Sequence, residues 1–125
     1  MVRYETVRDK GVPIGNLTSQ HFANFYLGAL DHYIKENLKR KMYIRYMDDF
    51  LTFGESKEEM KSLLKLIRVF LKNDLELELK NDIRINYNAH GIDFLGYRIF
   101  PNKIKLSKRS AKRFKKKFIL YEKKL

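Results

Sequence analysis

Two adjacent carboxylates, Asp48 and Asp49, are the residues of this 125-residue chain best suited to chemistry. Apolar, β-prone runs at 41–47 and 50–53 flank them, so we expect the pair at or beside the tip of a β-hairpin. Each carboxylate disfavours ionisation of the other unless a cation lies against them. The pair therefore indicates either a metal site or a solvated turn, since Asp tolerates turn geometry, and the dipeptide alone favours the turn.

Strand alternation divides the first of these runs between two faces of the expected hairpin. One face holds Met42, Ile44 and Tyr46, and the other holds Tyr43, Arg45 and Met47. The aspartates are thus expected to follow an aromatic strand that has two chemically different sides.

A loop with two glycines and a proline, residues 11–20, precedes the hairpin and runs into a predicted helix. Asn16, Thr18 and Ser19 are all suitable N-caps, so the start of the helix stays open. Its apolar residues recur at spacings of three and four, which predicts one stripe: Phe22, Phe25, Tyr26, Ala29, Leu30, Tyr33, Ile34 and Leu38. Backbone N–H groups at such a junction suit a phosphate, although an ordinary loop-to-helix junction has the same appearance.

The elements after the hairpin are predicted from local signals. Ser56 and Glu59 form a capping box for a helix with a core stripe of Met60, Leu63, Leu64, Ile67, Phe70 and Leu71. Alternating residues predict strands at 75–80 and 83–87, separated by an Asn81-Asp82 turn, and a further strand over 91–100. Gly96 within that strand suggests a bulge or a close approach by another backbone. Pro101-Asn102 then turns the chain into 103–106, which makes a second hairpin.

The composition excludes several classes of protein. The chain has no cysteine, so disulfides and Cys-ligated zinc are excluded, and its three histidines show no metal-ligand spacing. We expect no membrane association, because no apolar run reaches membrane-spanning length, and we expect a cytoplasmic location because no signal peptide is apparent. The expected fold class is α+β, an antiparallel sheet with helices packed on one face.

The net charge of +12 is concentrated at the C-terminal end, where residues 101–125 carry eleven Lys or Arg and one Glu. A helix from Ser107 is predicted, with Ala111, Phe114, Phe118, Tyr121 and Leu125 on one face. Its other residues are largely basic: Lys108, Arg109, Lys112, Arg113, Lys115, Lys116 and Lys117. Such a face could follow a phosphate backbone, lie on a membrane surface, or serve only as a solubilising tail.

Four blocks in order now resemble the reverse transcriptase family. Tyr46-Met47-Asp48-Asp49 resembles the family's palm tetrad, and 14–20 with 23–27 resembles the preceding nucleotide-contacting loop and helix. Phe94-Leu95-Gly96-Tyr97 resembles the primer-grip hairpin, and the basic helix falls where the thumb begins. The resemblance implies that residues 1–106 form the C-terminal part of a polymerase palm, including a primer-grip-like hairpin at 91–106. Residues 107–125 would begin the thumb.

The resemblance also implies a role for each block in Mg²⁺-dependent nucleotidyl transfer. Asp48 would be a direct metal ligand and Asp49 would support the two-metal site. The incoming nucleotide or template would contact Gly15, Asn16, Ser19, Gln20, Tyr46, Met47 and Lys80. The primer would contact Phe94, Leu95, Gly96 and Tyr97, and the nucleic-acid backbone would contact Lys108, Arg109, Lys112, Arg113 and Lys116. For Met47, Lys80 and the grip-like hairpin, packing or a surface position is the competing interpretation.

The resemblance places the chain among bacterial reverse transcriptases of the group II intron and retron-like superfamily. Thr18-Ser19-Gln20 replaces the Pro-Gln-Gly usual in group II intron enzymes and is most similar to the enzymes of diversity-generating retroelements. The implied partners are an RNA template, a DNA primer, a dNTP and, optionally, an accessory protein. The family's further catalytic aspartate should precede Gly11, and Asp9 is no match for it, so we expect an incomplete metal site and an inactive fragment. The alternative is a non-catalytic, nucleic-acid-binding remnant.

Overall fold

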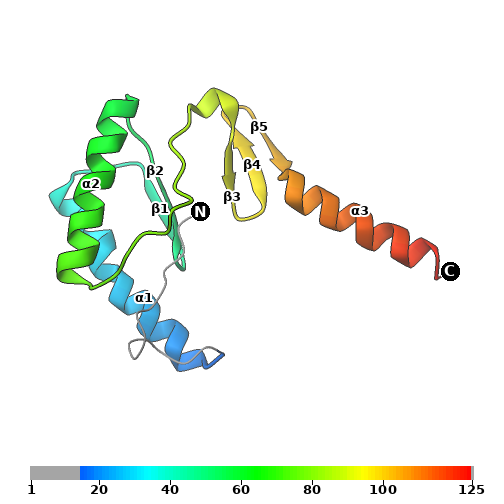
Figure 1. Cartoon of the computed structure of the whole chain (residues 1–125), viewed down its shortest axis with the longest axis horizontal. Coiled ribbons are helices and arrows are strands. Elements are labelled where there is room, and N and C mark those ends of the chain that lie inside the picture. The colour runs from blue at the N-terminus through cyan, green and yellow to red at the C-terminus, as the bar shows by residue number, and fades with distance from the viewer. Residues whose placement is uncertain (1–14, 125) are drawn as a thin grey trace. The chain divides into compact units, whose positions relative to one another are not determined.

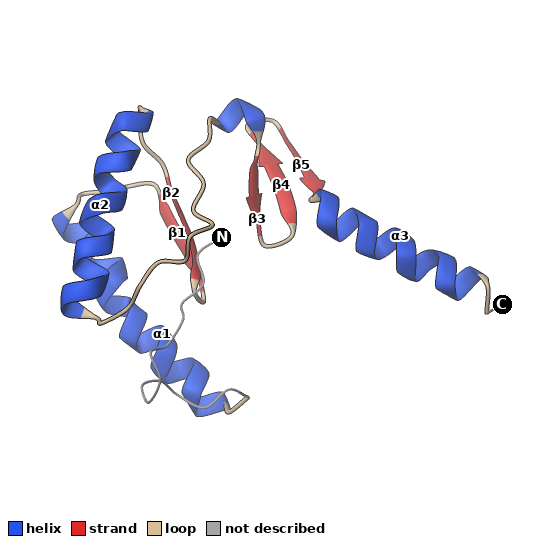
Figure 2. Ribbon diagram, in the orientation of Figure 1, coloured by secondary structure: helices blue, strands red, loops and turns tan. Residues whose placement is uncertain are grey.

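The structure is a computed structural model of the chain, and it describes residues 15–124. Helices and small antiparallel sheets form an α+β fold (Figures 1 and 2), which confirms the expected fold class. The chain divides into two compact units between Ile85 and Asn86. The expected helix residue Leu125, and Asp9, Gly11 and Ile14 of the N-terminal blocks, lie outside the described residues.

Side-chain caps fix where the two helices of the first unit begin. Helix α1 (Leu17–His32) starts after Asn16, whose side chain accepts a hydrogen bond from the Thr18 N–H at 3.3 Å. It continues into a π-helical turn, η1 (Tyr33–Asn37). Helix α2 (Lys57–Asp74) starts after Ser56, whose hydroxyl accepts from the Glu59 N–H at 3.1 Å. The structure therefore selects Asn16 among the open caps and confirms Ser56.

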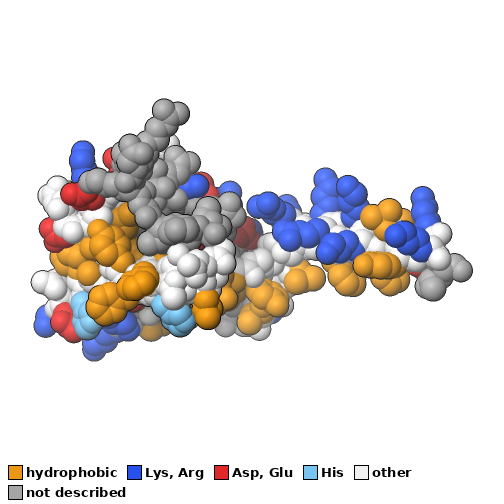
Figure 3. Space-filling model, turned by 90° about the horizontal axis from the view of Figure 1, so that it is seen from below, with side chains coloured by type: hydrophobic (Ala, Val, Ile, Leu, Met, Phe, Trp, Pro, Cys, Tyr) orange, Lys and Arg blue, Asp and Glu red, His pale blue; other side chains and the backbone are white. Residues whose placement is uncertain are grey.

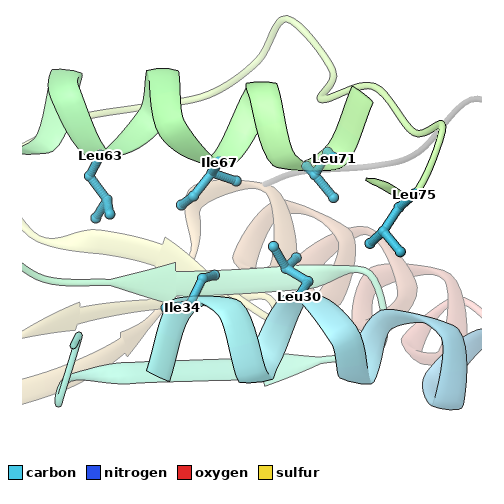
Figure 4. Packing of buried hydrophobic residues seen from close by; sticks show 6 residues of the cluster. All are labelled: Leu30, Ile34, Leu63, Ile67, Leu71 and Leu75. Atoms are coloured by element: carbon cyan, nitrogen blue, oxygen red, sulfur yellow. The ribbon is translucent and has the colours of Figure 1, made fainter. Parts of the chain in front are cut away.

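A hairpin of β1 (Tyr43–Tyr46) and β2 (Asp49–Thr52) lies between these helices in the chain. The core is formed by aliphatic side chains of α2 and of α1 with η1, which point toward one another (Figure 4). Its buried members are Leu30, Ile34, Leu63, Ile67, Leu71 and Leu75. Tyr43 and Phe50 pack against this cluster from the two strands. The helices thus cover the face of the hairpin that holds Tyr43 and Phe50. Strand alternation alone could not show which of the two faces would be covered.

The opposite face of the hairpin is apolar but exposed. Met42, Ile44 and Tyr46 all lie in solvent, so the face richest in apolar residues is not the face that packs on the helices. The predicted single stripe of α1 is likewise wrong in part, because Phe22 and Phe25 are exposed. Of the predicted stripe, Leu30 and Ile34 are buried because they pack in the cluster with α2, and Leu27, which is outside the predicted stripe, is buried as well.

The strands predicted at 75–80 and 83–87 do not form. Burial still alternates, with Leu75 buried and Leu77 and Leu79 partly buried against the core, and Asn81-Asp82 is a turn as expected. A strand requires a neighbour to share its hydrogen-bond ladder, and none of the described strands pairs with these residues. The segment is therefore extended without being part of a sheet.

The second unit is a three-stranded antiparallel meander followed by a helix. Its elements are η2 (Asn88–His90), β3 (Ile92–Phe94), β4 (Tyr97–Phe100), β5 (Lys103–Leu106) and α3 (Lys108–Glu122). The expected single strand over 91–100 is two strands, because Leu95 (φ 50°) and Gly96 (φ 84°) form a tight turn between them. Gly96 is thus a turn residue rather than a bulge.

The close approach expected at Gly96 is present. Its carbonyl accepts a hydrogen bond from the Ser107 N–H at 2.9 Å, and a Cβ at this position would lie 3.0 Å from the Ser110 Oγ. Ser107 also caps α3, with its hydroxyl accepting from the Ser110 N–H at 3.2 Å. Among residues 15–124, no helix has the length and apolar character needed to cross a bilayer.

Candidate catalytic hairpin

The two aspartates lie where the β1–β2 hairpin reverses direction. Tyr46 and Asp49 are the last paired residues, so Met47 and Asp48 form a two-residue loop. Asp49 begins β2 and shares a face with Tyr46, because residues directly opposite each other in antiparallel strands point to the same side. That side faces away from the helices; Tyr46 is exposed there, whereas Asp49 is half-buried and its Oδ1 is out of contact with solvent. The predicted position of the pair at the tip of a hairpin is confirmed.

The backbone at the tip has an unusual conformation for its sequence. Met47 has a φ of 56°, in the left-handed region that favours glycine. A positive φ at the first of two loop residues is the pattern of a type II′ turn, where glycine is the preferred residue. Met47 therefore occupies a strained position immediately before Asp48.

Arg45 connects this tip to α1, and sequence reasoning did not identify it. Its Nε and Nη2 donate to Oδ1 and Oδ2 of Asp31 at 2.8 and 2.7 Å, a bidentate ion pair. Its Nη1 donates to the Met47 carbonyl at 2.6 Å and to Asn24 Oδ1 at 3.1 Å. Sequence offered one weak signal for this network, namely an arginine on the same predicted strand face as the aromatic Tyr43.

Asp31 receives a third hydrogen bond, from the Tyr43 hydroxyl at 2.7 Å. Burial by itself raises the pKa of Asp31, but hydrogen bonds from Arg45 and Tyr43, with the charges of Arg45 and His32, outweigh burial and lower that pKa below its usual value. The carboxylate is therefore held in its charged form. An ionised Asp31 can orient the guanidinium of Arg45 at neutral pH.

The hairpin supplies donors of the type that Mg²⁺ prefers, because Asp48 and Asp49 are carboxylates and Mg²⁺ favours oxygen ligands. Within residues 15–124, however, no three His, Cys, Asp or Glu side chains come close enough together to hold a metal ion. The donors present fit Mg²⁺ in chemistry and fall short in number.

The predicted nucleotide-binding residues before the hairpin lie at the start of α1. Gly15 has a φ of 89° and precedes the cap Asn16, while Gln20 is exposed and Ser19 is buried. Gln20 lies one helical turn before Asn24. Asn24 in turn contacts the hairpin tip, since its Nδ2 lies 3.8 Å from the Met47 Sδ. The structure thus brings this end of α1 toward Met47.

The other predicted site residues lie elsewhere in the chain. Lys80 is half-buried in the extended segment after α2. Phe94, Leu95, Gly96 and Tyr97 form the β3–β4 turn of the second unit, with Tyr97 exposed. Their roles in binding nucleotide and primer stay predictions.

The basic helix α3 has two contrasting sides (Figure 3). The predicted backbone-binding residues are all exposed: Lys108, Arg109, Lys112, Arg113 and Lys116. The apolar residues Phe114, Phe118 and Tyr121 are also more than half exposed, so most of the apolar side of this amphipathic helix is exposed in the part of the chain that the structure describes. The exposed cations are available to a polyanion.

A family model described as reverse transcriptase (RNA-dependent DNA polymerase) matches residues 2–99. The match includes α1, the aspartate hairpin, α2 and nearly all of the β3–β4 hairpin. Among curated proteins, no sequence matches the chain.

Proposed function

The chain belongs to the reverse transcriptase family, and we propose that it contributes the aspartate hairpin of the palm to an RNA-directed DNA polymerase. The observation that carries this proposal is the placement of Asp48 and Asp49 at the tip of a hairpin whose strained loop is linked to helix α1 through Arg45. A solvated turn would not need these hydrogen bonds between the loop, Arg45 and α1. They support a hairpin tip that holds its two carboxylates in a defined position.

In this proposal Asp48 is a direct Mg²⁺ ligand, and Asp49 supports the site from the face of β2 that points away from the helices. Bound Mg²⁺ would stabilise the charge that develops on the attacking and leaving oxygens of nucleotidyl transfer. Because no three potential metal ligands gather within residues 15–124, this proposal requires a further carboxylate from outside them. The isolated chain is therefore expected to be inactive.

The substrates would be an RNA template, a DNA primer and a dNTP. Gly15, Asn16, Gln20 and Tyr46 would contact the nucleotide or the template, supported by the approach of α1 to the tip. The β3–β4 turn would hold the primer. The basic side of α3, in a thumb beginning at residue 107, would neutralise backbone phosphates.

The finer classification rests on Thr18-Ser19-Gln20, which begins α1. We propose a bacterial, cytoplasmic enzyme most similar to those of diversity-generating retroelements. This classification is compatible with an accessory protein and with an oligomeric assembly, but it requires neither.

Primer extension on an RNA template tests the proposal. It is measured for residues 1–125 alone and for a fusion in which a reverse transcriptase's fingers and first palm strand precede them. We expect Mg²⁺-dependent extension by the fusion only, and loss of at least about 100-fold with Asp48→Ala. If the fusion carrying Asp48→Ala still extends the primer, the role proposed for Asp48 is wrong. If residues 1–125 alone carry out templated synthesis, no further carboxylate is needed.

One observation favours a second candidate, a remnant that binds nucleic acid without chemistry. The described residues contain no complete metal-binding group, whereas their basic residues are exposed on α3. This candidate predicts salt-sensitive binding that is indifferent to Asp48→Ala and Asp49→Ala, with no extension by the fusion. Extension by the fusion would exclude it.

A further inference from the structure

The hairpin loop needs an external restraint. Met47 has a φ of 56°, which an L-residue with a long side chain rarely adopts. Such a conformation persists only where the surroundings over-determine it. The residue that follows it is Asp48, so any change in the Met47 backbone would redirect the carboxylate proposed to bind metal.

The guanidinium of Arg45 supplies contacts of the required kind. Its Nη1 donates to the Met47 carbonyl at 2.6 Å, so it bonds directly to the strained peptide. The same nitrogen donates to Asn24 Oδ1 at 3.1 Å. Asn24 also reaches the Met47 side chain, with 3.8 Å between Nδ2 and Sδ. Met47 is therefore contacted at both its backbone and its side chain.

The guanidinium itself is fixed by α1. Asp31 accepts from Nε and Nη2 at 2.8 and 2.7 Å, and the Arg45 side chain is only 12% exposed. The bidentate pair sets the plane of the guanidinium, which leaves Nη1 aimed at the loop. Asp31 and Asn24 are seven residues apart on α1, two helical turns, so both lie on the same side of the helix.

We propose that Arg45 is a positioning residue, which transmits the rigid frame of α1 to the Met47 carbonyl and so fixes the turn that presents Asp48 and Asp49. This inference rests on the proposed function, because a fixed turn is needed only if the two aspartates bind metal. Lysine cannot replace arginine here, because one ammonium nitrogen cannot pair with Asp31 in two places and reach Met47 as well.

The test uses labelled residues 1–125 and two NMR readouts. The first is the strong intraresidue amide–Hα NOE of Met47 that a positive φ produces. The second is the Mn²⁺ concentration that half-broadens the amide resonances of Asp48 and Asp49, with Mn²⁺ standing in for Mg²⁺. The variants are Arg45→Lys and Asn24→Ala, and the matched control is Arg40→Lys, which alters the ion pair with Glu59 in the same unit without touching the loop.

We expect Arg45→Lys to weaken the Met47 NOE and to raise the half-broadening Mn²⁺ concentration about tenfold, as loss of an outer-shell partner does in metal sites. Asn24→Ala should change both readouts in the same direction by less, and Arg40→Lys should change neither. Wild-type readouts in Arg45→Lys would overturn the proposal. Should that variant not fold, Asn24→Ala decides, because Asn24 is exposed, and wild-type readouts there would overturn the proposal equally.

Failure of the proposed function gives a different result. If Mn²⁺ broadens the wild-type resonances no more than it does in Asp48→Asn, metal binding at the hairpin is wrong. The Met47 NOE still decides in that case whether Arg45 holds the turn. The two conclusions are therefore separable.

Discussion

Arg45 and Asp31 are fourteen residues apart in the chain and form a bidentate ion pair, with Nε to Oδ1 at 2.8 Å and Nη2 to Oδ2 at 2.7 Å. The pair joins the strand before the aspartates to the helix that precedes it. Tyr43 adds its hydroxyl to the same carboxylate at 2.7 Å. Neither Asp48 nor Asp49 takes part in this ion pair. The pair nevertheless orients the Arg45 guanidinium, which donates to the Met47 carbonyl in their loop.

The lowered pKa of Asp31 makes stability depend on pH in the acid range. Arg45 and Tyr43 face Asp31 from β1, and His32 lies beside it on α1; together they lower the pKa of Asp31 below its ordinary 3.8 although burial raises it. Since the folded pKa is below the unfolded one, the stabilisation is complete above pH 3.8 and is lost as the pH falls through the folded pKa. Wild type should therefore exceed Asp31→Asn in unfolding free energy at pH 6, and this difference should shrink below about pH 4.

Urea unfolding followed by circular dichroism between pH 3 and pH 7 measures this difference. A difference that stays constant down to pH 3 would contradict the assigned ion pair. An Asp31→Asn variant as stable as wild type at pH 6 would do the same.

Two leucines on α2 allow a matched test of the core. Leu71 is fully buried in the cluster, whereas Leu66 is 47% exposed. Leu71→Ala should lower the unfolding free energy by about 2–5 kcal/mol, because it removes transfer energy and leaves a cavity. Leu66→Ala should change it by about 0.5 kcal/mol or less. Equal losses in the two variants would show that α2 does not bury the face described here.

Two glycines should respond oppositely to alanine. Gly96 has a positive φ, and a Cβ there would lie 3.0 Å from the Ser110 Oγ, so Gly96→Ala should destabilise the second unit by about 1–2 kcal/mol. Gly28 lies inside α1, and apart from the adjoining backbone of its own helix no atom lies within 4 Å of the position that a Cβ would take. Gly28→Ala should stabilise the first unit by about 0.5–1 kcal/mol.

Amide hydrogen exchange reports on the two glycine variants separately, because β3–β4 and α1 belong to different units. Unchanged protection of the β3–β4 amides in Gly96→Ala would contradict the close approach between that turn and α3. Reduced protection of α1 in Gly28→Ala would contradict its open surroundings.

Charge on α3 should set the salt dependence of nucleic-acid binding. Neutralising Lys112, Arg113 and Lys116 to Gln should lower the slope of log K against log salt by about 2 for a single strand, since each lost phosphate contact removes about 0.7. The matched control neutralises Lys61, Lys65 and Arg68, which are exposed on α2 and carry the same charge. This control should retain most of the slope.

Fluorescence polarisation with labelled single-stranded RNA, at a series of salt concentrations, gives both slopes. Equal losses in the two triple variants would mean that net charge alone, rather than α3, binds the strand. Tighter binding to anionic vesicles than to RNA would favour the membrane-surface interpretation of this helix.

Sequence alone determined the features that depend on neighbouring residues. The cap Ser56, the helix beginning near Ser107, the stripe of α2 and the turn containing Asp48 were readable, because each depends on residues only a few positions apart. The family resemblance followed from the same short blocks. The match over residues 2–99 confirms it.

Tertiary structure decided what lies against each surface. Phe22 and Phe25 have helical spacing but are exposed, and the leucines from 75 to 79 alternate without a strand to pair with, because burial and pairing require a partner far away in the chain. The same reason hid Arg45. Its charge suggested a solvated strand residue, and only packing against α1 brought Asp31 and Asn24 to it and aimed it at Met47.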